Sequence, residues 1–260
     1  MLGTDAKMKT RESGMPDEQT WDRFFDPASI LMRLGLTAVC RNVVELGCGY
    51  GTFTIPAARI ISGTFYAIDI DAEMIAATKK KAETAGLHNV RVCLRDFAAE
   101  GTGLPSASVD YVMLFNILHS EQPMILLEEA YRVLSLGGKV GIVHWNYDPS
   151  TPRGPSMSIR PRPEQCAAWA EQAGFQRLPS GVMSLPPYHY GMVLKKAGGE
   201  CRRQERRRYL MEPVKIGQIL CCDNCGVELK VVKDCDSTCV CNIICCDQPM
   251  RLKEDPDDAC

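Results

Sequence analysis

One short segment restricts the fold of this chain more than any other feature. The sequence VVEL at residues 43–46 is mostly apolar and β-branched, as in a buried strand, and Gly47, Gly49 and Gly51 follow it directly. Glycine adopts backbone conformations closed to other residues and lets a ligand approach the main chain without meeting a Cβ. A helix that starts after such a loop points its unpaired N–H groups at the loop. The segment therefore predicts a strand, tight turn and helix that bind a small anionic or zwitterionic cofactor.

The spacing of these residues separates two kinds of cofactor. Dinucleotide enzymes use G-x-G-x-x-G after the first strand, whereas here Glu45 is followed by Gly47, Gly49 and Gly51 at alternate positions. This pattern resembles motif I of the class I S-adenosylmethionine-dependent methyltransferases. The resemblance covers roughly residues 21–196. It implies that S-adenosylmethionine is the cofactor and that these four residues contribute to its site.

Two carboxylates follow at the distances seen in that family. Asp69 ends a second apolar strand about 20 residues further on, where a carboxylate reaches the ribose hydroxyls. Asp96, with Phe97, ends a third strand, where the family holds the adenine. The alternative is that Asp69 merely terminates a strand and that Asp96 caps a turn.

Strands and helices alternate in the predicted secondary structure. Helices are expected after the glycine loop and in three further segments, and the strands are expected at 43–46, 64–68, 90–94, 109–115, 139–145, 175–185 and 188–195. The last two are joined closely enough to be antiparallel. The prediction is an α/β fold with a doubly wound, mostly parallel, seven-stranded Rossmann-like sheet and a small cysteine-rich β domain at the C-terminus.

An amphipathic helical segment precedes the first predicted strand. Residues 17–34 carry an apolar face that is interrupted at Asp26-Pro27. Its sequence resembles the N-terminal cap of some small methyltransferases, which implies that Trp21 and Phe25 line a substrate pocket. The simpler alternative is that these aromatic rings pack on the core.

Candidate catalytic residues follow the strand that ends at Phe115. Methyl transfer needs positioning and exclusion of water, and it needs a base where the acceptor loses a proton. By resemblance to methyltransferases of ubiquinone and menaquinone biosynthesis, Asn116 would lie near the methionine part of the cofactor and His119 near the acceptor, as its general base. The alternative for His119 is a local hydrogen bond, and His144 and His189 are equally open candidates for the pocket rim.

The composition of the 260 residues limits the classes of function. A net charge of −2 gives no overall field for nucleic acid or membrane, and a base-modifying Asp/Asn-Pro-Pro-aromatic element is absent from the sequence. There is no long apolar run and no secretion signal in the N-terminal sequence, so a cytoplasmic protein is expected. The acceptor is therefore expected to be a small molecule, with no nucleic acid and no membrane as partner.

Cysteine is unusually frequent, with 14 in the chain, and it gathers near the C-terminus. Cys222 and Cys225 form a C-x-x-C pair, and Cys245 and Cys246 are adjacent. Four thiolates suit a closed tetrahedral metal site. The segment resembles desulforedoxin and the N-terminal domain of desulfoferrodoxin, which implies one iron held by these four residues and pairing of two chains.

Several alternatives stay open for the cysteine-rich tail. Zinc can replace iron in a tetrathiolate site, and Cys221, Cys239 or Cys241 could substitute as ligands. Disulfides are the non-metal alternative. The histidines lie upstream, so the histidine-bound iron of a superoxide reductase is not expected.

The sequence thus predicts an S-adenosylmethionine-dependent methyltransferase of small molecules with an appended iron or zinc module. The expected domains are a helical cap at 1–40, a methyltransferase domain at 41–197, a basic linker at 198–212 and a metal domain at 213–260. One alternative is a non-catalytic protein that binds the cofactor and senses redox state or carries electrons. A second is a methyltransferase for arsenite or another metalloid, for which Cys166 is the best-placed thiol in the first domain.

Overall fold

The structure is a computed structural model that describes residues 16–196 continuously and short parts of the tail. The described tail residues are 217, 219–221, 227–232, 244–245, 248–249 and 251–252. The chain divides into two compact units, Met1–Gly198 and Gly199–Cys260. The finer division into cap, methyltransferase domain, linker and metal domain stays a prediction.

The first unit is built on one seven-stranded sheet with the order β3-β2-β1-β4-β5-β7-β6. Its strands are β1 (Val43–Leu46), β2 (Phe65–Asp69), β3 (Val90–Leu94), β4 (Val109–Phe115), β5 (Leu134–Trp145), β6 (Phe175–Leu185) and β7 (His189–Lys196). The first five pair in parallel, and β7 lies antiparallel between β5 and β6. The predicted doubly wound, mostly parallel, seven-stranded sheet is confirmed.

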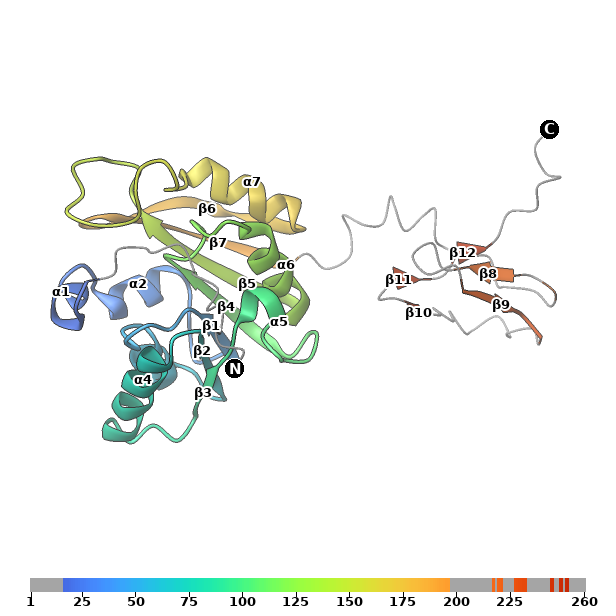
Figure 1. Ribbon diagram of the computed structural model, residues 1–260, viewed down its shortest axis with the longest axis horizontal. Coiled ribbons are helices and arrows are strands. Elements are labelled where there is room, and N and C mark those ends of the chain that lie inside the picture. The colour runs from blue at the N-terminus through green and yellow to red at the C-terminus, as the bar shows by residue number, and fades with distance from the viewer. Residues whose placement is uncertain are drawn as a thin grey trace, which may run out of the picture. The chain divides into compact units, whose positions relative to one another are not determined.

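Helices cover both faces of this sheet (Figure 1). They are α1 (Glu18–Asp22), α2 (Pro27–Arg33), α3 (Thr54–Ile60), α4 (Ala72–Thr84), α5 (Phe97–Glu100), α6 (Pro123–Val133) and α7 (Pro163–Gln172). Helix α3 contacts both α2 and α4, and helix α6 contacts both α5 and α7. Each group covers its own hydrophobic core.

Alternation along β4 explains the two cores. Tyr111 and Met113 belong to the core beneath α2 and α3, whereas Val112 and Leu114 belong to the core beneath α6 and α7. All four side chains are fully buried. Successive residues of a strand point to opposite faces, so a continuous apolar run such as β4 fits a strand with helices on both sides.

Local sequence signals account for most helix ends. Asp71 caps α4 by accepting a hydrogen bond from the Glu73 N–H at 2.8 Å. The break at Asp26-Pro27 separates α1 from α2, because Asp26 caps α2 and Pro27 takes its first position. The expected strand at 139–145 is longer than predicted, since β5 begins at Leu134 and continues through the glycine pair.

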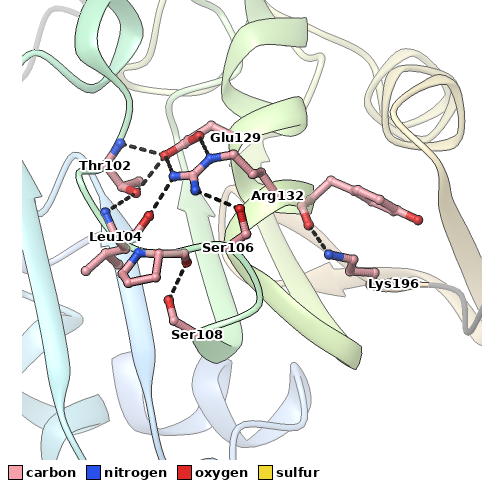
Figure 2. A network of polar contacts seen from close by, with 9 residues as sticks. Thr102, Leu104, Ser106, Ser108, Glu129, Arg132 and Lys196 are labelled. Atoms are coloured by element: carbon pink, nitrogen blue, oxygen red, sulfur yellow. Dashed lines mark hydrogen bonds and ion pairs between the residues drawn. The ribbon is translucent and has the colours of Figure 1, made fainter. Parts of the chain in front are cut away.

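A polar network fastens α6 to the loop that leads into β4 (Figure 2). Glu129 accepts hydrogen bonds from the N–H and the hydroxyl of Thr102, both at 2.6 Å, and from the guanidinium of Arg132 at 2.7 Å. Arg132 also donates to the Leu104 carbonyl at 2.8 Å and to the Ser106 hydroxyl at 3.2 Å. This bidentate pair fixes the loop at 102–106 in place.

Lys196 at the end of β7 binds carbonyls at the C-terminal end of α6 (Figure 2). Its ammonium donates to the carbonyls of Tyr131 and Leu134, at 2.6 and 2.7 Å. A cation near unpaired helix carbonyls is electrostatically favourable. Lys196 therefore anchors the last strand to the first unit.

The described tail residues form short antiparallel strands. These are β8 (Ile219–Cys221), β9 (Glu228–Lys230), β10 (Ile244–Cys245), β11 (Gln248–Pro249) and β12 (Arg251–Leu252). They make one sheet of order β12-β8-β9 and a separate β10-β11 pair. The predicted cysteine-rich metal-binding β domain stays a prediction, because its predicted metal ligands are not among the described side chains.

Candidate active site

The glycine loop after β1 has the conformation that its sequence predicts. Gly47, Gly49 and Gly51 all have positive φ, at 78°, 52° and 75°. A Cβ at Gly47 would lie 2.8 Å from Ile117 Cδ1, and a Cβ at Gly51 would lie 2.9 Å from the Thr78 hydroxyl oxygen. Any other residue at these two positions would be strained by the positive φ, and its side chain would also collide with a neighbour.

Asp69 holds this loop against the end of β2. One carboxylate oxygen accepts a hydrogen bond from the Gly49 N–H at 2.9 Å, and the other accepts one from the Asp71 N–H at 3.0 Å. Thr78 donates from its hydroxyl to the Gly49 carbonyl at 2.8 Å. Burial raises the pKa of Asp69 from its ordinary value, and the backbone hydrogen bonds oppose that rise. Asp69 therefore lies at the glycine loop, where a ribose contact was predicted, and it also organises the loop.

Glu45 lies beneath the loop at the start of α3. Its carboxyl group is buried and accepts a hydrogen bond from the Thr54 hydroxyl at 2.6 Å. Burial raises the pKa of Glu45 to about 8, against the opposing effect of the Thr54 hydrogen bond. The carboxyl group is therefore mainly protonated at neutral pH, and it ties β1 to the first residue of α3.

Asp96 and Phe97 lie beyond the end of β3, at the start of α5. Asp96 caps this helix by accepting hydrogen bonds from the N–H groups of Ala98 and Ala99, at 3.1 and 3.0 Å. The ring of Phe97 is buried in the core beneath α6. The contact at Asp96 is the turn cap that the sequence offered as the alternative, and the predicted adenine contact stays a prediction.

Asn116 follows β4 with a backbone φ of 54°, which is unusual for a residue other than glycine. Its N–H donates to the Val143 carbonyl at 2.7 Å. The side-chain oxygen and nitrogen are buried, and neither has a hydrogen-bond partner among the described residues. Leaving a buried amide unpaired costs about 1–3 kcal/mol per group. Strain and unpaired polar atoms together are typical of a ligand-binding position.

His119, three residues after Asn116, lies in the wall of a cavity of about 380 Å³. The imidazole is 6% exposed. Tyr147, Arg162 and Trp169 are among the other residues in the wall. A cavity of this volume is within the range that binds small molecules.

The other two candidate histidines, His144 and His189, lie at different places in the structure. His144 pairs with Tyr190 across β5 and β7, and its ring centroid lies 5.5 Å from that of His119. His189 instead packs between Trp145 and Phe25, with ring centroids 4.3 and 4.5 Å away. Of the two, His144 is therefore the one beside His119.

Both of these histidines are neutral at neutral pH. Burial lowers the pKa of His144 well below its ordinary value, and that of His189 to about 3. Neither has a hydrogen-bond partner for its ring nitrogens among the described residues. They are uncharged polar groups in an apolar setting.

The N-terminal helices pack over the glycine loop. The Thr52 hydroxyl donates to the Asp22 carboxylate at 2.7 Å, and the Tyr50 hydroxyl donates to the Pro16 carbonyl at 3.2 Å. The ring of Trp21 is half-buried and lies 4.9 Å from that of Phe25. The aromatic residues thus pack together on the core, which agrees with the simpler of the two sequence interpretations.

Arg160 is a site residue that the sequence did not reveal. Its guanidinium is buried and donates to several backbone carbonyls and one hydroxyl, those of Asn146, Asp148, Thr151, Arg153 and Pro155. Burial lowers the pKa of Arg160, and the charge of Asp148 opposes that effect. The arginine in the proline-rich segment was a visible signal, but its carbonyl partners could not be read from local sequence.

The four predicted metal ligands lie outside the described side chains. Cys245 is described as backbone in β10, and Cys222, Cys225 and Cys246 are not described. Among the residues that the structure does describe, no group of three or more metal-binding side chains occurs. In the same residues, no helix is long and apolar enough to cross a membrane.

Comparison with known proteins agrees with this geometry. Residues 43–138 match the family described as "Methyltransferase domain". A methyltransferase from Aquifex aeolicus that depends on S-adenosylmethionine has a similar structure, with a TM-score of 0.61 and 24% identity over 70% of this chain and 94% of that one. The first unit therefore has the Rossmann-like α/β methyltransferase fold. The matched family and the Aquifex aeolicus protein are both described as methyltransferases.

Two relatives show how far the similarity extends. The chain is 28% identical to aklanonic acid methyltransferase DauC of Streptomyces sp. (strain C5), over 54% of this chain and 66% of that protein. It is 29% identical to demethylmenaquinone methyltransferase of Geobacillus sp. (strain WCH70), over 38% of this chain and 43% of that protein. The chain thus spans less than two thirds of either relative. The [4+2]-cyclase SpnF has a similar fold, with a TM-score of 0.58 and 17% identity over 72% of this chain and 85% of that one.

Proposed function

We propose that this chain transfers a methyl group from S-adenosylmethionine to a small-molecule acceptor. The observation that carries the proposal is the glycine loop held by Asp69 directly beside the unpaired amide of Asn116. Ile117, the residue after Asn116, connects the two, because its Cδ1 lies 2.8 Å from the position that a Cβ of Gly47 would take. The match of residues 43–138 to a methyltransferase domain supports the same conclusion.

The residues around the loop fit this cofactor. When bound, S-adenosylmethionine supplies an electrophilic methyl group on a sulfonium sulfur. The three glycines of the loop all have positive φ and carry no Cβ, which leaves main-chain surface on which a ligand can lie. Asp69 keeps carboxylate lone pairs for ribose hydroxyls, and the unpaired Asn116 amide can accept and donate hydrogen bonds at the amino-acid end.

His119 is the proposed general base for an acceptor that loses a proton. Its buried ring lies in the cavity wall, where it can take a proton from an acceptor held there. The remaining task of the protein is to align donor and acceptor and to exclude water. The Trp21 and Phe25 rings, packed beside the loop, contribute to that exclusion.

The experiment is calorimetric titration with S-adenosylmethionine followed by detection of S-adenosylhomocysteine release with a panel of small acceptors. In His119→Gln we expect an unchanged cofactor affinity and a methyl-transfer rate lower by about 10²-fold or more. The exposed His88 gives a matched control, and His88→Gln should behave as the unchanged protein.

Absence of cofactor binding would contradict the proposal as a whole. Cofactor binding without turnover of any acceptor would favour the non-catalytic alternative. An equal rate in His119→Gln would remove the base from the mechanism while leaving the cofactor site intact.

The metalloid alternative has less support from the described thiols. Cys166 lies in the core, and its sulfur is 3.3 Å from the Tyr190 hydroxyl. Burial raises the pKa of Cys166 to about 12 and also raises that of Cys48. Metalloids bind thiolates, so two protonated thiols inside the first unit weigh against an arsenite site there.

We also propose that residues 213–260 form a metal module in which Cys222, Cys225, Cys245 and Cys246 hold iron, or zinc in its place, and through which two chains pair. The strand pairings support this arrangement. Arg251 at the start of β12 lies opposite Cys221 at the end of β8. Because the two strands are antiparallel, Cys221 and Arg251 lie at the same end of the small sheet.

Metal analysis and an absorption spectrum of anaerobically purified protein test the module. One iron per chain with thiolate-to-metal bands is the expected result, and zinc would make the module structural or a docking element. Protein without metal, whose thiols are all oxidised or free, would refute it. Sedimentation of the same sample at several concentrations tests the proposed pairing of two chains.

A further inference from the structure

The cavity beside His119 carries an unbalanced charge. It is bounded by the loop after β4, by Tyr147 after β5 and by the start of α7. Two arginines, Arg160 and Arg162, line it, whereas Glu121 is the single carboxylate in its wall. The cavity therefore favours a ligand with a negative charge.

The two arginines differ in what their donors do. The guanidinium of Arg160 already donates hydrogen bonds to protein carbonyls and one hydroxyl. It therefore contributes a fixed positive charge to the cavity wall. The guanidinium of Arg162 lies with its central carbon 3.7 Å from the centre of the Tyr147 ring. Stacking uses the flat face of the guanidinium and leaves the N–H groups at its edge for another acceptor.

In the described part of the chain, no carboxylate forms an ion pair with the N–H groups of Arg162. The ion pairs there involve Lys81, Arg95, Arg132 and Arg177, but not Arg162. A guanidinium with open edge donors matches a ligand carboxylate in two parallel hydrogen bonds. Arg162 also precedes α7, whose N-terminal end adds a partial positive charge at the same wall.

His144, which lies behind His119 at the other side of the cavity, adds no positive charge there. His144, behind His119, is fully buried, and burial lowers its pKa well below the ordinary value. Its ring nitrogens have no partner among the described residues. This side is therefore suited to a neutral hydroxyl, while the attraction for an anion comes from the arginine side.

We propose that this cavity binds a small, planar hydroxy acid, with its carboxylate paired to the edge of Arg162 and its hydroxyl directed toward His119. The flat surfaces of Tyr147 and Trp169 and the volume of about 380 Å³ suit one or two rings. The inference rests on the proposed function, because it names the acceptor class for the same site. Arg162 is thus a specificity-determining residue that anchors the acceptor away from its reacting end.

The test compares two probes of similar size and shape, of which one carries a carboxylate and the other a neutral carboxamide. The full chain is titrated by calorimetry at neutral pH with 3-hydroxybenzoate and with 3-hydroxybenzamide, each with and without S-adenosylhomocysteine. We expect the acid to bind about tenfold or more tightly than the amide. Arg162→Gln should abolish this preference. Arg177→Gln, an exposed arginine outside the cavity with the same loss of charge, should keep it.

Equal affinities for the two probes, or no binding of either, would overturn the inference. So would an unchanged preference in Arg162→Gln. If Arg162→Gln does not fold, the comparison of the acid and amide in the unaltered protein still decides. Titration with S-adenosylmethionine is a separate readout. A protein that binds the acid but does not bind S-adenosylmethionine would contradict the proposed function alone. A protein that binds S-adenosylmethionine but shows no preference for the acid would contradict this inference alone.

Discussion

Replacement of Glu129 by glutamine tests the polar network between α6 and the loop before β4. Burial by itself raises the pKa of Glu129, but hydrogen bonds from Arg132 and Thr102 and the charge of Arg132 outweigh it and lower the pKa from 4.5 to about 2. One pH unit corresponds to about 1.4 kcal/mol. The lowering therefore corresponds to about 3 kcal/mol of stabilisation in the native state.

Solvent reduces that value. The Glu129 side chain is 10% exposed, but that of Arg132 is 40% exposed, so water screens part of the attraction. We expect Glu129→Gln to lower the free energy of unfolding by about 2 kcal/mol at pH 7. Because the folded pKa is below the unfolded one, this contribution is complete above about pH 4.5 and is lost as the pH falls toward 2. The difference between the two proteins should shrink over that range.

Urea unfolding followed by tryptophan fluorescence at pH 7, 4.5 and 3 measures this difference. All three tryptophans, Trp21, Trp145 and Trp169, lie in the first unit, so the signal reports on that unit alone. Glu128→Gln is the matched control, because its side chain is exposed on the same helix. An equal loss in both variants, or a loss independent of pH, would show that the network does not stabilise the fold in the way described.

Two further predictions concern the cofactor loop and are measured by urea unfolding and S-adenosylmethionine titration. Gly51→Ala should cost about 1–2 kcal/mol, because its φ is 75° and the new Cβ would meet Thr78, and it should weaken cofactor binding. Gly86→Ala has a similar φ of 66° with open space around it, so it should lose stability without changing cofactor affinity, and an affinity loss there would count against the reasoning. Asn116→Gly should keep or raise stability, since glycine suits the φ of 54° and the unpaired amide is removed, while cofactor affinity falls about tenfold. Lower stability with unchanged affinity would assign Asn116 to the fold and not to the site.

The sequence predicted those parts of the fold that depend on neighbouring residues. The apolar run of β4, the break at Asp26-Pro27 and the glycine loop are local patterns, and the structure has each of them where the sequence placed it. The extra length of β5 was missed because Gly137 and Gly138 read locally as a break. In the fold, Val109 pairs with Leu134 ahead of that glycine pair, so the strand continues.

The candidate site could be predicted in part for the same reason. Glu45, Asp69 and Asn116 could be proposed from sequence because each lies in or just after a strand at a characteristic spacing, and their binding roles stay predictions. The roles of Thr78, Arg160 and Arg162 depend on partners far along the chain, or on backbone carbonyls that carry no sequence signal. Asp96 shows the converse, since its spacing fits a ligand contact while its carboxylate caps α5.

The anchored end of β7 has a consequence for how the two units can be combined. The strand is complete at Lys196, and that side chain is held by the carbonyls of Tyr131 and Leu134. Every strand of the seven-stranded sheet lies before this point. A different module joined after Lys196 would replace no part of the sheet and none of the residues around the glycine loop. The first unit is in this sense an interchangeable part, to which a gene fusion can attach a new partner without redesign of its sheet or its glycine loop.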